Sequence, residues 1–172
     1  MIWHMSHRAD PLAAEIADRH YNRQKIGSPQ FVPPGRCLVL FARTETGRAF
    51  WVTSWPFGEY VKHRWPGAWV CSAFRNERAG KASDMIWQAL AATRHRYGDP
   101  PDRGLVSFID RRKVEPTMVR GKPVWGWTWL KVGFEYDGET EGGLLAVRLR
   151  PERFPQPSAP KQMLPGPLFA AA

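Results

Sequence analysis

The chain has few cysteines, and both lie in segments whose composition is typical of strands. They are Cys37 and Cys71, in a sequence of 172 residues. Two cysteines are too few for a disulfide framework, and two lone cysteines make a poor zinc site. We therefore expect two reduced cysteines in the core. A disulfide between neighbouring strands stays open as the alternative.

Long apolar runs are also missing. No stretch approaches the roughly 20 apolar residues that a membrane-spanning helix needs. The first residues, MIWHMSHRADP, lack the apolar segment of a secretory signal peptide. The sequence therefore predicts a cytoplasmic protein that makes no membrane contact.

Acidic side chains are scarce relative to basic ones. Lysine and arginine number 25 against 16 aspartates and glutamates, which leaves a formal net charge of +9, and the chain has nine tryptophans. Cations release counterions from a polyanion and aromatic rings stack on bases, so this composition favours a nucleic-acid partner such as double-stranded DNA. The alternative is that the arginines only solvate the surface and the tryptophans fill the core.

The spacing of apolar and turn residues predicts a single domain over residues 1–150. A proline-rich tail over 151–172 is expected to be disordered or draped over the surface. The predicted elements are a helix over 11–21, strands over 37–42, 48–54 and 69–74, a helix from Ser83 to Gly98, a strand over 105–109, a basic loop over 111–122, a helix over 123–132, and strands over 134–136 and 144–149. This order predicts an α/β (α+β) fold with a mixed, mostly antiparallel sheet, a central parallel βαβ crossover and flanking helices.

The segment AWVCSAFRNERAGKASDMIWQALA, residues 69–92, is the first candidate site. It reads as an apolar strand, a short cationic turn and an amphipathic helix with Ser83 at its N-cap. Such an arrangement directs backbone N–H groups and arginines at one point and suits a phosphate-bearing cofactor. The predicted ligands are Arg75, Asn76, Arg78, Gly80 and Ser83. The alternative is a solvated turn in which an arginine pairs with Glu77.

The element order resembles the GNAT fold of the Gcn5-related N-acyltransferases over roughly residues 10–150. Three stretches carry this resemblance: RNERAGKAS after the strand, the strand that ends at Asp110, and WTWLKVGF over 127–134. More narrowly, RHYNRQKIGSPQFVPPG, FRNE and FIDRRKV resemble phage proteins of the Mom type, which modify the exocyclic amine of adenine in duplex DNA. The resemblance implies a phage or prophage transferase that places a small acyl-type or carbamoylmethyl-type group on a nucleobase amine, adenine N6 first.

The resemblance also implies cofactors. They are acetyl-CoA or a related acyl donor at the turn, and iron at a site that includes His20 and Asp110 beside Tyr21. One position departs from the family pattern, because Arg78 stands where the acyltransferase loop has its first glycine. A side chain there partly fills the phosphate cradle, although an arginine could also clamp a phosphate itself.

His20, Tyr21 and Asp110 are the predicted catalytic residues. A histidine can accept a proton from an amine or bind a metal, and a tyrosine can protonate a departing thiolate. Asp110 follows an apolar strand, where it would serve as a ligand or base; alternatively it pairs with the arginines that follow it.

The densest basic cluster follows Asp110. It comprises Arg111, Arg112, Lys113, Arg120 and Lys122, with three alternate tryptophans just beyond. We predict that this loop contacts DNA and that the tryptophans help to hold an extruded base. The alternative is that the tryptophans pack a short helix onto the sheet.

Two further functions stay open, and so does one further contact. The chain could be an acetyl-CoA-dependent N-acetyltransferase that acts on a small amine or a protein lysine, or a catalytically inactive GNAT-like module that only binds DNA. In the tail, residues 162–169 loosely resemble peptides that bind sliding clamps, but their spacing favours chance similarity.

Overall fold

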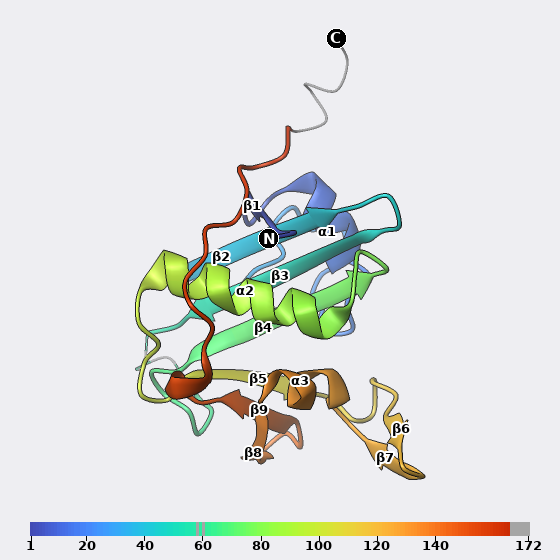
Figure 1. The fold of residues 1–172 in the computed structure, drawn as a ribbon, viewed down its shortest axis with the longest axis vertical. Coiled ribbons are helices and arrows are strands. Elements are labelled where there is room, and N and C mark those ends of the chain that lie inside the picture. Colours follow the sequence, from blue (N-terminus) through green and yellow to red (C-terminus); the bar gives the residue numbers. More distant parts are fainter. Residues whose placement is uncertain (58, 60, 166–172) are drawn as a thin grey trace.

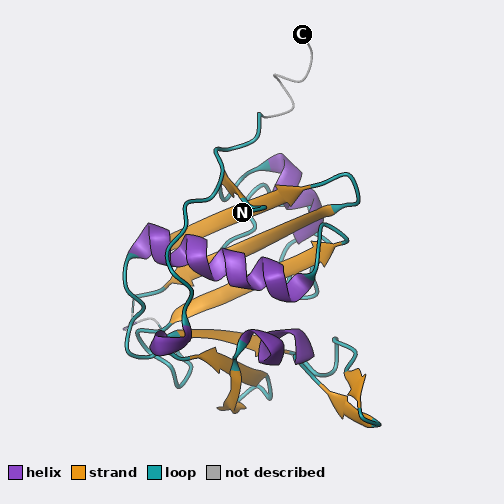
Figure 2. Ribbon diagram, in the orientation of Figure 1, coloured by secondary structure: helices purple, strands orange, loops and turns teal. Residues whose placement is uncertain are grey.

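The structure is a computed structural model that describes residues 1–57, 59 and 61–165. Figures 1 and 2 show a curved sheet with a long helix across one face. The main sheet has the order β1-β2-β3-β4-β5-β9-β8. Its strands are β1 (His4–Ser6), β2 (Arg36–Arg43), β3 (Arg48–Trp55), β4 (Trp69–Glu77), β5 (Leu105–Ile109), β8 (Glu135–Glu139) and β9 (Leu145–Leu149). The fold is thus mixed α+β, as the sequence predicts.

Antiparallel pairing dominates the sheet. Strands β2 and β3 form a long hairpin in which Arg36 faces Trp55 and Arg43 faces Arg48. Among the strands of the described residues, β4 and β5 form the one parallel pair, joined by helix α2 (Ala82–Tyr97). This is the predicted crossover. Gly98, with a φ of 88°, ends the helix.

Two apolar layers cover the faces of the sheet. On one face, α2 and α3 (Trp127–Val132) pack over a core that contains Trp3, Trp51, Trp69 and Leu90. On the other face, α1 (Pro11–Ala17) packs against β2 and β3 through Ile16 and its neighbours. Tryptophan thus fills much of the core, which was the alternative to a surface role.

Strands β4 and β5 separate soon after they meet. Their pairing covers only residues 69–71 of β4 and 105–107 of β5. Beyond that point β4 follows β3 and β5 follows β9. A register shift between Val52 and Thr53 of β3 leaves Ser72 of β4 as an extra, bulged residue at the point of divergence. Bulges bend strands and re-aim their side chains, so the gap between the strands opens here.

Several predicted boundaries are wrong. Strand β4 continues to Glu77, so Arg75 and Asn76 belong to the strand and not to the turn, because they pair with Phe50 and Ala49 of β3. Helix α2 begins at Ala82 with Lys81 as its N-cap, and Ser83 lies in its first turn without capping it. Its hydroxyl instead donates to Asp84.

The predicted basic loop contains a hairpin. Strands β6 (Thr117–Val119) and β7 (Lys122–Val124) form a separate two-stranded sheet joined by Arg120 and Gly121. Both turn residues have positive φ, 49° and 76°, the pattern of a type I′ turn. As a result α3 begins only at Trp127, after Gly126, and not at 123.

The tail is ordered as far as it is described. After a short 3₁₀ turn, Pro151–Arg153, the ring of Phe154 packs edge-on against Trp69. The chain then crosses α2, where Ser158 N–H donates to Ala91 O. At Lys161 it meets β1, donating to Trp3 O and accepting from Met5 N–H. The residues proposed to contact a sliding clamp, 162–169, lie partly outside the described residues.

Both cysteines are free thiols. Cys37 is on β2 and Cys71 is on β4, and β3 lies between the two strands, so the alternative of a disulfide does not occur. Burial raises the pKa of the Cys71 thiol far above its usual value. No helix among the described residues is long and apolar enough to cross a membrane.

Candidate functional site

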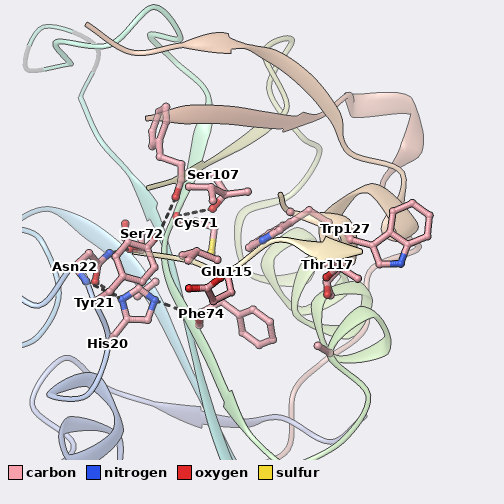
Figure 3. A pocket seen from close by; sticks show the side chains of 18 residues that line it. His20, Tyr21, Asn22, Cys71, Ser72, Phe74, Ser107, Glu115, Thr117 and Trp127 are labelled. Atoms are coloured by element: carbon pink, nitrogen blue, oxygen red, sulfur yellow. Dashed lines mark hydrogen bonds between the residues drawn. The ribbon is translucent and has the colours of Figure 1, made fainter. Parts of the chain in front are cut away.

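A cavity of about 240 Å³ occupies the gap between β4 and β5. One wall consists of residues 20–22, which follow α1. The opposite wall consists of residues in the segment 114–117, which leads into β6, and of residues 126–129 at the start of α3. The edges of β4 and β5 lie between these walls (Figure 3). The residues that line it include five with aromatic rings: Tyr21, Phe74, Phe108, Trp127 and Trp129. A planar molecule therefore finds apolar faces in this cavity.

The three residues His20, Tyr21 and Asn22 bind to the separated strand edges. His20 Nε2 donates to Phe74 O at 3.2 Å, and Asn22 Nδ2 donates to Ser72 O at 2.7 Å. The Tyr21 hydroxyl donates to Phe108 O on the opposite strand at 3.1 Å. Where β4 and β5 diverge, these carbonyls face the gap and have no strand N–H from which to accept a hydrogen bond. Because a buried carbonyl needs a donor, the three side chains take the place of the missing strand. The segment thus holds the gap open.

His20 is buried and neutral near pH 7. Burial lowers its pKa, and the positive charge of Arg75 acts in the same direction. A carbonyl oxygen only accepts, so the proton of the neutral ring lies on Nε2, opposite Phe74 O. Nδ1, which carries no proton in this tautomer, accepts from the Asn22 backbone N–H at 3.3 Å. Both ring nitrogens are therefore engaged by the protein, and the ring acts mainly to position Tyr21.

Tyr21 stacks on that ring and remains protonated. The ring centroids of His20 and Tyr21 are 4.6 Å apart, with an interplanar angle of 27°. Burial raises the pKa of the Tyr21 hydroxyl. A protonated hydroxyl held at the junction of two strands can donate a proton to a group that leaves a substrate.

The buried histidine predicts that acidification destabilises the protein. The folded-state pKa of His20 and of half-buried His63 lies below the unfolded value of 6.5, so each contributes stability that is complete above about pH 6.5 and is lost as the pH falls through the folded value. Each contributes a slope of at most about 1.4 kcal/mol per pH unit. Urea unfolding of wild type and His20→Gln between pH 7.5 and 5.5 should give a shallower slope for the variant. His95→Gln, at an exposed site on α2, should keep the wild-type slope, and an equally steep His20→Gln profile would contradict the assignment.

Asp110 does not join the cavity. Its carboxylate binds Arg112 through both oxygens, at 2.8 and 3.1 Å, and this partner lowers the pKa of the Asp110 carboxyl. The alternative interpretation of Asp110, a salt-bridge partner, thus describes its contacts. Burial has the larger effect on the pKa of the Tyr21 hydroxyl and raises it, whereas the Asp110 backbone N–H lowers it.

The donor set does not fit iron. Both His20 nitrogens and both Asp110 oxygens have protein partners. Within the described residues there is no group of three or more histidine, cysteine, aspartate or glutamate side chains that could hold a metal ion. Iron therefore has no set of ligands here.

The predicted cofactor residues bind mainly to one another and to their neighbours. Arg75 donates to Glu77 and to Arg19 O, and Arg19 and Arg75 together hold the pKa of Glu77 at about 2. The Asn76 side chain closes the turn by accepting from Ala79 N–H and donating to Gly80 O. Arg75 therefore pairs with Glu77, as expected from the alternative interpretation of this segment as a solvated turn.

The turn itself is no glycine cradle. Arg78 adopts a φ of 65° without being glycine. At Gly80 a Cβ would meet Met85 at an ordinary 3.6 Å. A second feature favours a phosphate site near this turn: Ala82, the first residue of α2, lines the cavity. The helix N-terminus therefore faces it.

The predicted DNA-binding residues fall into two groups. Arg111 pairs with Glu139 and Arg112 with Asp110, so part of their charge is neutralised. Arg120 and Lys122, on the hairpin, form no salt bridge with any residue that the structure describes. The hairpin projects from the molecule beside the cavity, which Thr117 lines at its base (Figure 1).

A second hollow adjoins the cavity on the α1 face of the sheet. It measures about 530 Å³, and its wall includes Ser72 and Phe108, which also line the cavity. Lys62, His63 and Arg64 lie along it. Sequence reasoning missed this hollow, as well as Asn22, Ser72 and Glu115. Asn22 could have been found as the residue that follows the His-Tyr pair, whereas the hollow depends on loops far apart in the sequence.

Comparison with family models, with curated proteins and with solved structures gives no match to the chain.

Proposed function

We propose that the protein is a GNAT-like transferase that modifies the exocyclic amine of a nucleobase in DNA, with adenine N6 as the first candidate and phage DNA modification as its setting. The observation that carries the proposal is the cavity between β4 and β5, because Tyr21 lines it and a second hollow adjoins it at Ser72 and Phe108. A group transfer needs two substrates in contact. The cavity and the second hollow share Ser72 and Phe108, so molecules bound in the two would meet beside Tyr21.

The assignment of substrates follows from the walls. An acyl donor would enter the cavity from the α2 side, where Ala82 begins the helix and the helix dipole favours phosphate. The base would occupy the second hollow, whose wall includes the rings of Phe108 and His63, which pack against each other with centroids 5.2 Å apart and an interplanar angle of 50°. The exposed side chains of Lys62 and Arg64 along that hollow suit the phosphates on either side of an extruded nucleotide.

In such a transfer Tyr21 would donate one proton to the leaving group and then recover one from the attacking amine. With a thioester donor, the amine nitrogen attacks the carbonyl carbon and the carbon–sulfur bond breaks. The departing thiolate takes the Tyr21 proton, and the tyrosinate regains a proton from the ammonium group that has formed. His20 positions the phenol by stacking, and Asp110 orients the basic loop through Arg112.

The decisive measurement is the base composition of DNA from cells that express the protein. We expect mass spectrometry of the nucleosides to show a deoxyadenosine of increased mass, which should be absent from cells that express Tyr21→Phe. DNA without any modified base, recovered with abundant folded protein, would contradict the proposal.

A second candidate is an acetyl-CoA-dependent N-acetyltransferase for a small amine or a lysine. The position of Ala82 at the cavity favours it, since a helix N-terminus is a general phosphate site. Calorimetric titration with acetyl-CoA, followed by mass spectrometry of a polyamine or a lysine peptide, distinguishes the two. Tight binding with an acetylated amine and unmodified DNA would favour this candidate.

A further inference from the structure

The β6–β7 hairpin has the shape and surface of a nucleic-acid probe. It is a two-stranded ribbon apart from the main sheet, and Figure 1 shows it projecting from the end of the molecule near the end of β5. Such a small ribbon is marginal without packing. Its type I′ turn at Arg120 and Gly121 matches the natural twist of paired strands and helps to keep it formed.

One face of the ribbon is apolar and exposed. Met118 lies directly opposite Pro123 in the pairing register, so the two side chains share a face. Met118 is 63% exposed. Met118 lies one pair before the turn of this cationic projection, and an unbranched, exposed apolar side chain there suits insertion into a base stack.

We propose that this hairpin enters the major groove of B-form DNA and that Met118 fills the space left in the base stack when the target nucleotide is extruded. The inference rests on the proposed function. Paired strands lie about 4.8 Å apart, and the major groove, about 12 Å wide and 8.5 Å deep, admits a two-stranded ribbon. Three residues and a turn reach about 10 Å, which matches that depth.

The groove and the chemistry agree. The N6 amine of adenine lies on the major-groove edge of its base pair, so a ribbon in that groove meets the edge of the target base before the nucleotide is extruded. Arg120 and Lys122, which lack salt bridges among the described side chains, would bind the phosphates that border the groove. At the base of the ribbon Thr117 lines the cavity assigned to the donor, which shares Ser72 and Phe108 with the hollow assigned to the base.

The first experiment measures salt dependence. The variant Arg120→Asn/Lys122→Gln removes both charges and keeps a residue that tolerates the left-handed turn. We expect the slope of log K against log salt for a DNA duplex to fall by about 1.8, or about 0.9 for each phosphate that the variant leaves without its cation. The matched control Arg96→Gln/Arg103→Gln removes two exposed charges elsewhere and should leave the slope unchanged. Binding to an RNA duplex of equal length should not change with the hairpin variant, because its major groove is too deep and narrow for side chains to read.

The second experiment tests the wedge. A duplex with 2-aminopurine beside a central adenine should fluoresce more strongly when wild type binds, because the base loses its stacking. Met118→Ala should bind within about twofold of wild type but lose most of the fluorescence increase, and Met118→Leu should retain it. Met118→Ala with wild-type fluorescence would overturn the wedge, and a hairpin variant with an unchanged salt slope would overturn the groove assignment. If DNA is modified while either result holds, the proposed function stands without this inference; if wild type neither binds nor modifies DNA, both fail.

Discussion

Replacing Gly104 with alanine should destabilise the protein by at least about 3 kcal/mol, a large share of the 5–15 kcal/mol that holds a domain together. Gly104 has a φ of 64°, and a Cβ there would lie 1.9 Å from Leu149 O. Neither the backbone conformation nor the space accommodates a side chain. The clash separates the start of β5 from the end of β9, next to the bond from Trp69 N–H to Gly104 O where β4 and β5 first meet.

Gly98→Ala is the matched control for this substitution. Gly98 has a φ of 88°, yet nothing lies within 4 Å of a Cβ built there. With a ψ of −152° as well, Gly98 lies in a region that essentially only glycine adopts, so alanine should lose only that backbone cost, about 1–3 kcal/mol. Urea unfolding of both variants measures the difference. Equal destabilisation would show that the sheet relaxes around the new methyl group, contrary to the tight junction described above.

Replacing Tyr21 with phenylalanine should lower product formation by about 10²–10⁴-fold, the range of a lost general acid. The substitution removes one hydroxyl whose bond to Phe108 O contributes about 1 kcal/mol of stability. The protein should therefore stay folded at room temperature. Nucleoside mass spectrometry in a single-turnover time course measures the rate.

Tyr136→Phe controls for the loss of a tyrosine hydroxyl. The Tyr136 hydroxyl also donates to a backbone carbonyl, that of Trp125, at 2.6 Å. Tyr136 does not line the cavity and is 48% exposed. This variant should keep the wild-type rate. If Tyr21→Phe modified DNA as fast as Tyr136→Phe, Tyr21 would have no role in proton transfer.

Local patterns predicted the elements that local forces determine. The bounds of β5 follow from a run that is apolar except for Ser107, between Gly104 and Asp110, and the end of α2 follows from Gly98. The hairpin of β6 and β7 was within reach of the same reasoning, because Arg120-Gly121 separates two short strand-like runs. The prediction of a plain loop was wrong there because it weighed the basic charge of the segment and not its turn chemistry.

Distant pairing determined what local patterns could not predict. Strand β4 extends beyond its last apolar residue because Arg75 and Asn76 pair with residues of β3. The side chain of Asn76 then closes the turn, and α2 begins before Ser83 could cap it. The cavity has the same origin. His20 and Tyr21 were singled out from their residue types, but the bulge at Ser72 and the divergence of β4 from β5 arise only when strands far apart in the sequence pair.

The contact between the tail and β1 has a consequence for the order of folding, because its two segments are far apart in the sequence. Strand β1 completes one edge of the sheet, and Trp3 belongs to the main core, yet the backbone partner of both Trp3 and Met5 is Lys161. During synthesis the first strand emerges from the ribosome long before that partner exists. The inner edge of β1 can pair with β2 early, but its outer edge has no partner until Lys161 has been made. Contacts so distant in sequence slow folding. We infer that the closing step of folding is the docking of residues 154–161 across α2.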